Sequence, residues 1–215
     1  MKIGILAADS HNFPNLPLMK ISAFYKANGH EVEWWKSRKE NMTLFFVPLY
    51  FQKQKSPKVN NAKRVCIGGS GIDLDNRLPP EIETHYAGLF KSIRKSNFAV
   101  GFLTRGCPRL NHARSRGGFC ITPEKDGCIS RKVTDLSEFW TGQKKISLLD
   151  QNLLACKDRI ELINQLAASR AEIDFKGGLD ARYVNEEVSC RAETNKSTKL
   201  LLRLGRSKRR FIGTV

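Results

Sequence analysis

Short apolar segments that end at glycine or polar residues recur along this chain, and they constrain its fold more than any other feature. Residues 2–8, 98–103 and 145–149 form predominantly apolar runs of this kind. Such runs are typical of strands that a parallel sheet buries on both faces. Helical patterns lie between them, at 18–28 and 158–170. The alternation of strand and helix predicts an α/β protein.

The two helical patterns carry their own boundary signals. The segment 18–28 places alanine or methionine at intervals of four on one face, and Gly29 is positioned to end it. The segment 158–170 begins with Asp158 and Glu161, which are spaced as a capping pair. We therefore expect one helix in the first third of the chain and another in the second half.

Two further strands are expected in the first third. Residues 31–35 alternate apolar with charged side chains, which completes a β-α-β unit. Residues 63–67 form another apolar run and lead directly to Gly68 and Gly69. Glycines in this position allow the close approach of a phosphate-bearing ligand, and they serve equally well in a plain strand-to-loop turn.

The second half repeats the alternation. The strand at 145–149 ends at Asp150 and Asn152, and a strand at 173–175 closes with a glycine pair and Asp180. This succession fits the first part of a (β/α) barrel, in which reactive groups gather at the carboxyl ends of the strands.

Proline marks the passage between two domains. Pro79 and Pro80 interrupt regular structure, and the boundary should fall within 80–96. The predicted organisation is a first domain at 1–90, a second at 91–188 and a basic divergent tail at 189–215.

The net charge of +16 is concentrated in two places. Residues 36–64 contain eight Lys or Arg against one Glu, and residues 189–215 contain eight against one. A surface this basic attracts phosphate backbones, so nucleic acid is a candidate partner. A solvated basic face or a tail without a partner would give the same pattern.

The sequence gives no reason to expect a membrane or secretory location. The apolar run at 42–51 is ten residues long and contains Pro48, which is far too short to span a bilayer. The N-terminal segment forms a strand pattern and lacks the layout of a signal peptide. We expect a cytoplasmic protein, in which the six cysteines are thiols or metal ligands.

Four potential metal ligands cluster at 101–128. Cys107 follows the strand at 98–103, and His112, Cys120 and Cys128 complete a C-x4-H-x7-C-x7-C series. These are zinc ligands by type, but the series lacks the close C-x2-C pairing of structural zinc sites. Unligated thiols in a loop rich in Arg and Gly remain the alternative.

The cysteine loop resembles that of the radical S-adenosylmethionine enzymes. In that family three cysteines spaced C-x3-C-x2-C follow the first strand of a barrel, and an aromatic residue precedes the last cysteine. Cys107 and Cys120 match the outer cysteines, and Phe119 matches the aromatic residue. Gly117 stands where the middle cysteine is expected, and Cys107 precedes Cys120 by thirteen positions rather than seven.

The resemblance implies a four-iron four-sulfur (4Fe-4S) cluster bound by Cys107 and Cys120, with S-adenosylmethionine on the open iron. His112 or Cys128 would have to replace the missing thiolate, since imidazole replaces thiolate in some iron–sulfur centres. The spacing favours neither.

Other residues receive roles from the same likeness. Phe119 would shield the cluster, and Gly117 and Gly118 would admit the methionyl end of the cofactor. Contacts to S-adenosylmethionine or substrate at later strand ends would come from Asp150, Asn152 and Asp180, which also suit turns and helix caps.

The N-terminal segment is similar to cobalamin-binding domains. Residues 9–14 resemble the D-x-H-x-x-G loop in which histidine coordinates cobalt, and they place His11 in that role. Gly68 and Gly69 are similar to the glycines that receive the nucleotide tail. Pro14 stands where the family has glycine. A histidine that makes only local hydrogen bonds explains His11 equally simply.

The two likenesses together imply an N-terminal doubly wound, cobalamin-binding-like unit followed by a partial radical S-adenosylmethionine barrel. The implied reaction is reductive cleavage of S-adenosylmethionine to a radical, with the substrate open. The interrupted cysteine loop and the divergent tail indicate a shortened or degenerate copy. The alternative is a non-catalytic basic protein that binds nucleic acid.

Overall fold

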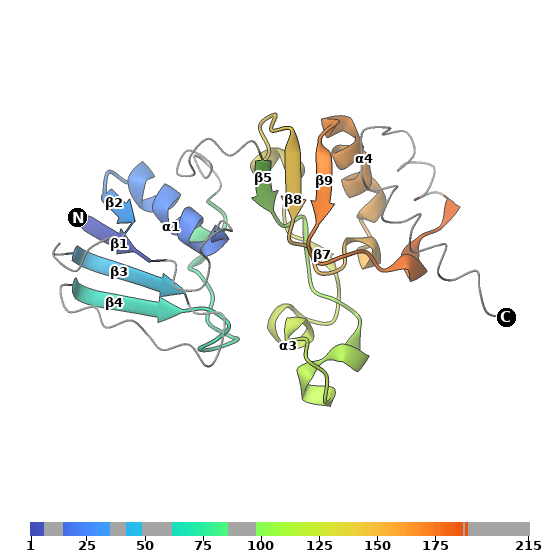
Figure 1. The fold of residues 1–215 in the computed structure, drawn as a ribbon, viewed down its shortest axis with the longest axis horizontal. Helices are drawn as coiled ribbons and strands as arrows, with labels where there is room; N and C mark the ends of the chain where they lie inside the picture. Colours follow the sequence, from blue (N-terminus) through green and yellow to red (C-terminus); the bar gives the residue numbers. More distant parts are fainter. Residues whose placement is uncertain (7–14, 35–41, 49–61, 86–97, 187, 189–215) are drawn as a thin grey trace. The chain divides into compact units, whose positions relative to one another are not determined.

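The computed structural model describes residues 1–6, 15–34, 42–48, 62–85, 98–186 and 188 (Figure 1). The chain divides into two compact units, Met1–Lys95 and Ser96–Val215. Each contains a parallel sheet with helical connections, which confirms the predicted α/β class. His11 and the segment 189–215 lie outside the described residues.

The first unit is built on a four-stranded sheet in the order β2-β1-β3-β4, and every neighbouring pair is parallel. The predicted strands are confirmed, and one strand that we did not predict lies within the sheet. Its elements are β1 (Lys2–Ile5), α1 (Leu16–Ala27), β2 (Glu31–Trp34), β3 (Met42–Pro48), β4 (Ala62–Gly68) and α2 (Pro80–Glu83).

Helix α1 begins where Asn15 caps it, because the Asn15 side chain accepts a hydrogen bond from Leu18 N–H at 3.2 Å. It ends before Gly29, whose φ of 76° is the left-handed conformation that glycine adopts readily. The helix packs Leu18 and Ile21 against Ile5 of β1 and Ile82 of α2. These contacts form the apolar core of the first unit.

The second unit contains a three-stranded parallel sheet in the order β5-β8-β9 and a separate antiparallel pair, β6-β7. Its elements are β5 (Phe98–Gly101), β6 (Thr104–Arg105), α3 (Thr122–Asp126), β7 (Arg131–Lys132), β8 (Lys145–Leu148), α4 (Arg159–Ser169) and β9 (Glu172–Phe175). Short 3-10 turns lie at Leu110–His112, Arg114–Arg116, Leu136–Glu138, Leu153–Ala155 and Ala181–Tyr183.

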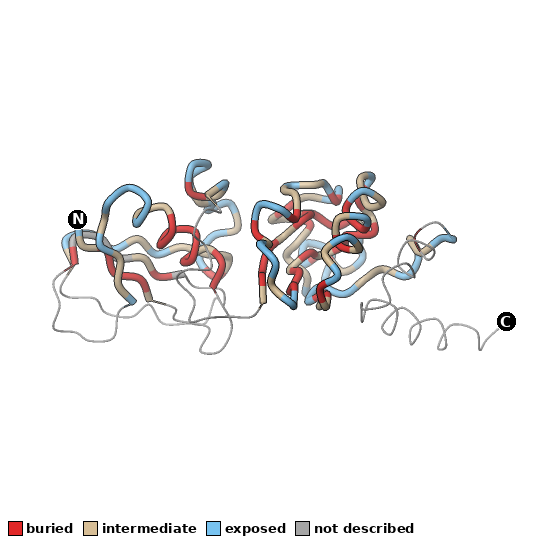
Figure 2. Tube along the Cα trace, turned by 90° about the horizontal axis from the view of Figure 1, so that it is seen from above, coloured by how far each residue is buried: buried red, intermediate tan, exposed pale blue. Residues whose placement is uncertain are grey.

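The core of the second unit lies between the sheet and α4, where Figure 2 shows buried segments gathered inside an exposed surface. Phe139 packs over Gly101 so closely that a Cβ at that glycine would come within 2.8 Å of its ring. Helix α4 buries Leu162, Ile163 and Leu166, whereas Ile160 and Ala167 are half-buried.

The predicted capping pair at the start of α4 is wrong. Asp158 is the N-cap residue, but its side chain makes no capping hydrogen bond. Glu161 instead binds Lys132, so it is not available to complete the capping pair. Among the described residues, no helix is long and apolar enough to cross a membrane.

Candidate functional site

The segments that follow β5, β8 and β9 begin side by side at one end of the sheet. The strands pair in register, with Gly101 opposite Leu148 and Leu148 opposite Phe175. Pairing continues past the strands, because Leu149 N–H donates to Gly101 O at 2.9 Å. The carboxyl end of a parallel sheet is where α/β proteins place their ligands. We call the residues that follow these three strands the carboxyl-end site.

Asp150 joins two of these segments. Its side chain is buried, and Oδ1 accepts hydrogen bonds from Thr104 N–H and Thr104 Oγ1, both at 2.6 Å. Oδ2 accepts a third from Leu103 N–H at 3.1 Å. A single carboxyl group thus ties the segment after β5 to the segment after β8.

Burial dominates the electrostatics of Asp150. Desolvation disfavours the charged form and raises the pKa of this carboxyl to about 6, although the hydrogen bonds from Thr104 and Leu103 act in the opposite direction. The donors of these hydrogen bonds, Leu103 and Thr104, both belong to the segment after β5. Its position beside Thr104 therefore gives it an evident structural role at the carboxyl-end site.

Cys107 lies within this site. Its thiol is buried, its N–H donates to Gly127 O at 3.1 Å, and its Sγ lies 3.8 Å from Asn152 Nδ2. Asn152 is itself buried, and its Oδ1 has no hydrogen-bond partner within the described part of the chain. The structure therefore brings together Cys107 and Asn152, two of the residues that the sequence singled out.

Two glycines make this arrangement possible. Gly106 has φ 94°, and a Cβ there would lie 2.1 Å from Ile129 O, so the backbone before Cys107 passes too close for any side chain. A Cβ at Gly177 would lie 2.0 Å from Asp150 O, where the segment after β9 packs onto the segment after β8. The sequence pattern placed Gly177 in a turn after a predicted strand and did not single out Gly106.

Asp126 is a buried anchor that the sequence analysis missed. Its carboxylate accepts a hydrogen bond from Gln151 Nε2 at 3.0 Å and lies 3.6 Å from Arg105 Nη1. Its carbonyl accepts from Arg131 Nη1 at 2.6 Å. The contacts fasten α3 to the segments after β5 and β8, which no local spacing in the sequence could have indicated.

Asp180 closes the segment after β9 and pairs with two arginines. Arg182 donates from Nη2 at 2.7 Å and from Nε at 3.0 Å, and Arg109 Nε lies 3.8 Å from Oδ2. The Arg182 hydrogen bonds are the main cause that lowers the pKa of Asp180. The pairing with Arg109 joins this segment to the chain just after Cys107.

The four candidate metal ligands do not gather at this site. Cys107 is buried, His112 and Cys120 are half-buried, and Cys128 is exposed. All four lie in the described ranges, where no group of three or more His, Cys, Asp or Glu side chains is positioned to hold a metal ion. The residues present therefore do not fit a four-iron cluster, nor a tetrahedral zinc site.

Phe119, Gly117 and Gly118, the neighbouring residues of the cysteine loop, have local roles in the structure. Phe119 is 84% exposed, and its ring centroid lies 6.1 Å from that of His112. Gly117 has φ 80°, and a Cβ at Gly118 would lie 2.3 Å from His112 O. The backbone geometry of the turn before Phe119 therefore explains why glycine occupies both positions.

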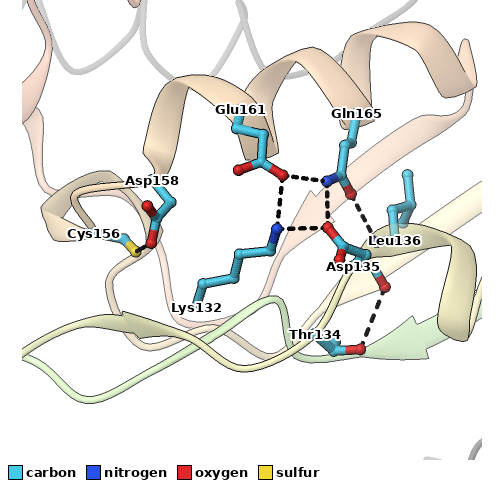
Figure 3. Close-up of polar contacts among 8 residues, drawn as sticks. All are labelled: Lys132, Thr134, Asp135, Leu136, Cys156, Asp158, Glu161 and Gln165. Carbon is cyan, nitrogen blue, oxygen red and sulfur yellow. Dashed lines mark hydrogen bonds and ion pairs between the residues drawn. The ribbon is translucent and has the colours of Figure 1, made fainter.

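A polar network joins the segment that begins at Lys132 to helix α4 (Figure 3). Lys132 Nζ lies 2.7 Å from both Asp135 Oδ1 and Glu161 Oε1, and Gln165 donates to Asp135 and accepts from Leu136 N–H. The carboxylates on either side raise the pKa of Lys132. These contacts anchor the segment after β7 to α4.

The candidate site in the first unit is only partly described. Gly68 ends β4, and Gly69 has φ 104° and accepts a hydrogen bond from Ile72 N–H at 3.0 Å. These contacts form a tight strand-to-loop turn, and its use as a nucleotide site stays a prediction. The chain matches no protein-family model, no curated protein and no solved structure.

Proposed function

We propose that the second unit is a partial radical S-adenosylmethionine barrel that keeps a ligand site but has lost the radical chemistry. The observation that carries this proposal is the position of Cys107, in the segment directly after β5 and in contact with Asn152 from the segment after β8. A thiol at the carboxyl end of the first parallel strand is the arrangement that the sequence likeness implies.

The loss of chemistry follows from the ligand set. A radical S-adenosylmethionine cluster needs three protein ligands and one open iron. In this chain Gly117 occupies the middle cysteine position, and the described donors do not converge. We therefore assign no redox step to this protein.

The ligand that suits the remaining site is S-adenosylmethionine or another nucleoside that carries an amino acid end. Support comes from the buried Asn152 amide, whose Oδ1 has no hydrogen-bond partner among the described residues, and from the Arg109, Asp180 and Arg182 group on the adjoining segment. Amide and guanidinium groups are the usual partners of an amino acid's polar end. Asn152 would be a binding residue, and Asp150 would position the segment that carries Cys107.

By the same likeness we propose that the first unit is a cobalamin-binding-like domain. Its parallel β2-β1-β3-β4 sheet and the glycine turn after β4 support the proposal. His11 lies outside the described residues, and the proposal does not include cobalt ligation by this histidine.

The proposal is tested by anaerobic reconstitution with iron and sulfide. We expect wild type and Cys107→Ala/Cys120→Ala to retain equally little iron, with Cys66→Ser as the control for loss of a thiol elsewhere. About four irons per wild-type chain, lost only in the double variant, would contradict the loss of chemistry.

Ligand retention is tested separately by equilibrium dialysis with S-adenosylmethionine. We expect binding by wild type and loss of binding in Asn152→Ala, while Asn164→Ala, an exposed position on α4, leaves binding unchanged. Wild-type protein that binds no S-adenosylmethionine would refute the retained site.

A further inference from the structure

A short loop in the second unit carries an exposed aromatic side chain and two exposed arginines. Phe119 is 84% exposed, the largest exposed fraction among the large hydrophobic residues that the structure describes. Arg114 and Arg116 precede it in the same loop and are exposed as well. We call Arg114, Arg116 and Phe119 the loop patch.

The backbone of this loop is closed by its own hydrogen bonds. Cys120 N–H donates to His112 O and Arg114 N–H donates to Cys120 O, both at 2.9 Å, and Ala113 pairs with Cys120 in an isolated bridge. Gly118 N–H donates to Ala113 O at 2.9 Å. The three residues of the loop patch therefore lie on one small closed turn.

A second contact holds the turn against α3. Glu124 Oε1 accepts a hydrogen bond from Ser115 N–H at 2.6 Å, and this bond is the main cause that lowers the pKa of Glu124. Ser115 lies between the two arginines of the loop patch. The loop is thus fixed at its base, and Figure 1 shows the α3 region extending away from the β5-β8-β9 sheet within its unit.

The surroundings of the loop are strongly basic. Residues 105–132 contain seven Lys or Arg against two acidic residues, Glu124 and Asp126. Both carboxylates are already engaged, Glu124 by Ser115 and Asp126 by Arg105 and Gln151. Arg114 lies close enough to Glu124 to contribute to the lowered pKa of that carboxyl, and the segment still keeps an excess of positive charge, seven basic residues against two acidic ones.

We propose that the loop patch binds single-stranded nucleic acid, with a base stacked on Phe119 and phosphates paired with Arg114 and Arg116. An exposed aromatic ring with guanidinium groups on the same loop suits a single-stranded partner, because each unpaired base offers a face for stacking and the backbone offers phosphates. A duplex hides those faces, so phosphate contacts alone would remain. The chain's net charge of +16 favours the same partner. This interaction needs neither cluster nor S-adenosylmethionine, and it goes beyond the proposed function.

The test uses the full chain and a fluorescein-labelled oligo(dT) of about twelve nucleotides, within the usual site size. Fluorescence anisotropy measures Kd over a series of salt concentrations. We expect Phe119→Leu to weaken binding about fivefold or more, since stacking is lost, and Phe119→Tyr to bind like wild type. The salt dependence of Phe119→Leu should equal that of wild type.

Replacing the arginines should change the salt dependence of binding, which Phe119→Leu leaves unchanged. Arg114→Ala/Arg116→Ala removes two phosphate contacts, so the slope of log Kd against log salt should fall by about 1.4. Lys144→Ala/Lys157→Ala is the matched control, because it removes the same charge from exposed positions elsewhere on the unit. Ile72→Ala controls for loss of an exposed apolar side chain, since Ile72 is 57% exposed.

The outcomes separate the partner classes. Binding at least about fivefold weaker in Phe119→Leu, with wild-type affinity in Phe119→Tyr and in both controls, supports the proposal. Equal weakening by the two double variants would mean that diffuse charge binds any polyanion, and it would overturn the proposal. Tighter binding of duplex DNA or of heparin than of oligo(dT), or no binding at low salt, would overturn it as well.

Discussion

Replacing Asp150 by asparagine should change how the stability of the second unit depends on pH. The folded-state pKa of Asp150 is raised from its ordinary 3.8 to about 6, so the folded chain holds this proton more tightly than the unfolded chain. Wild type therefore loses stability relative to Asp150→Asn as pH rises through this interval. The difference in pKa corresponds to about 3 kcal/mol in total, at about 1.36 kcal/mol per pKa unit.

The variant also carries a constant penalty. Asparagine has one acceptor oxygen, so its NH2 group would face either Leu103 N–H or the two Thr104 donors that Asp150 now satisfies. The penalty is about 1–3 kcal/mol for each donor left unpaired in a buried site. It does not vary with pH, and so it leaves the predicted slope intact.

The assay is urea unfolding followed by fluorescence of Trp140. Trp34→Phe and Trp35→Phe in both proteins leave Trp140 as the reporter of the second unit, where its Nε1 donates to Gln143 O at 2.8 Å. The free energies of unfolding of the two proteins are compared from about pH 4 to about pH 7. A difference that stays flat, or that grows in favour of wild type with rising pH, would refute the reasoning, because the three donors would then outweigh burial.

Two further predictions concern stability. Gly106→Ala should lower the free energy of unfolding by more than about 3 kcal/mol, because it combines a positive φ with a collision against backbone. Gly117→Ala has a positive φ but open space around the new methyl group, and it should cost about 1 kcal/mol; equal costs for the two variants in urea unfolding would show that the collision at Gly106 contributes nothing. Glu83→Ala should destabilise the first unit by about 1–3 kcal/mol, because it removes the carboxylate from the buried Lys20 ammonium while the Glu83 carbonyl remains bound to it. Lys20→Met should cost less, because the Glu83 side chain is 43% exposed and rehydrates; Trp34 fluorescence in urea measures both, and the reverse order would contradict this account.

The sequence predicted the elements that depend on local pattern. The apolar runs became β1, β5, β8 and β9, and the helix that ends before Gly29 became α1. Strand β3 (Met42–Pro48) was not predicted, because we considered this apolar run only as a segment too short to span a membrane. Pro48 can stand there because it is the last residue of the strand.

The candidate site was predictable in position but not in its contacts. Parallel strands bring their carboxyl ends together, and that rule alone placed Asp150, Asn152 and Cys107 near one another. The hydrogen bonds of Asp150 to Thr104 and the anchoring of Asp126 by Gln151 join residues far apart in the chain. Local spacing carries no information about such contacts.

The central claim is that the second unit keeps a ligand site of the radical S-adenosylmethionine type without a cluster, and Gly117→Cys tests it most directly. A Cβ at Gly117 would meet nothing within 4 Å, so the only structural cost is the positive φ. Because the described thiols do not converge, we predict that Gly117→Cys and wild type retain equally little iron after anaerobic reconstitution. About four irons per chain and a visible absorption band for Gly117→Cys, both lost when Cys107→Ala is added, would contradict the claim.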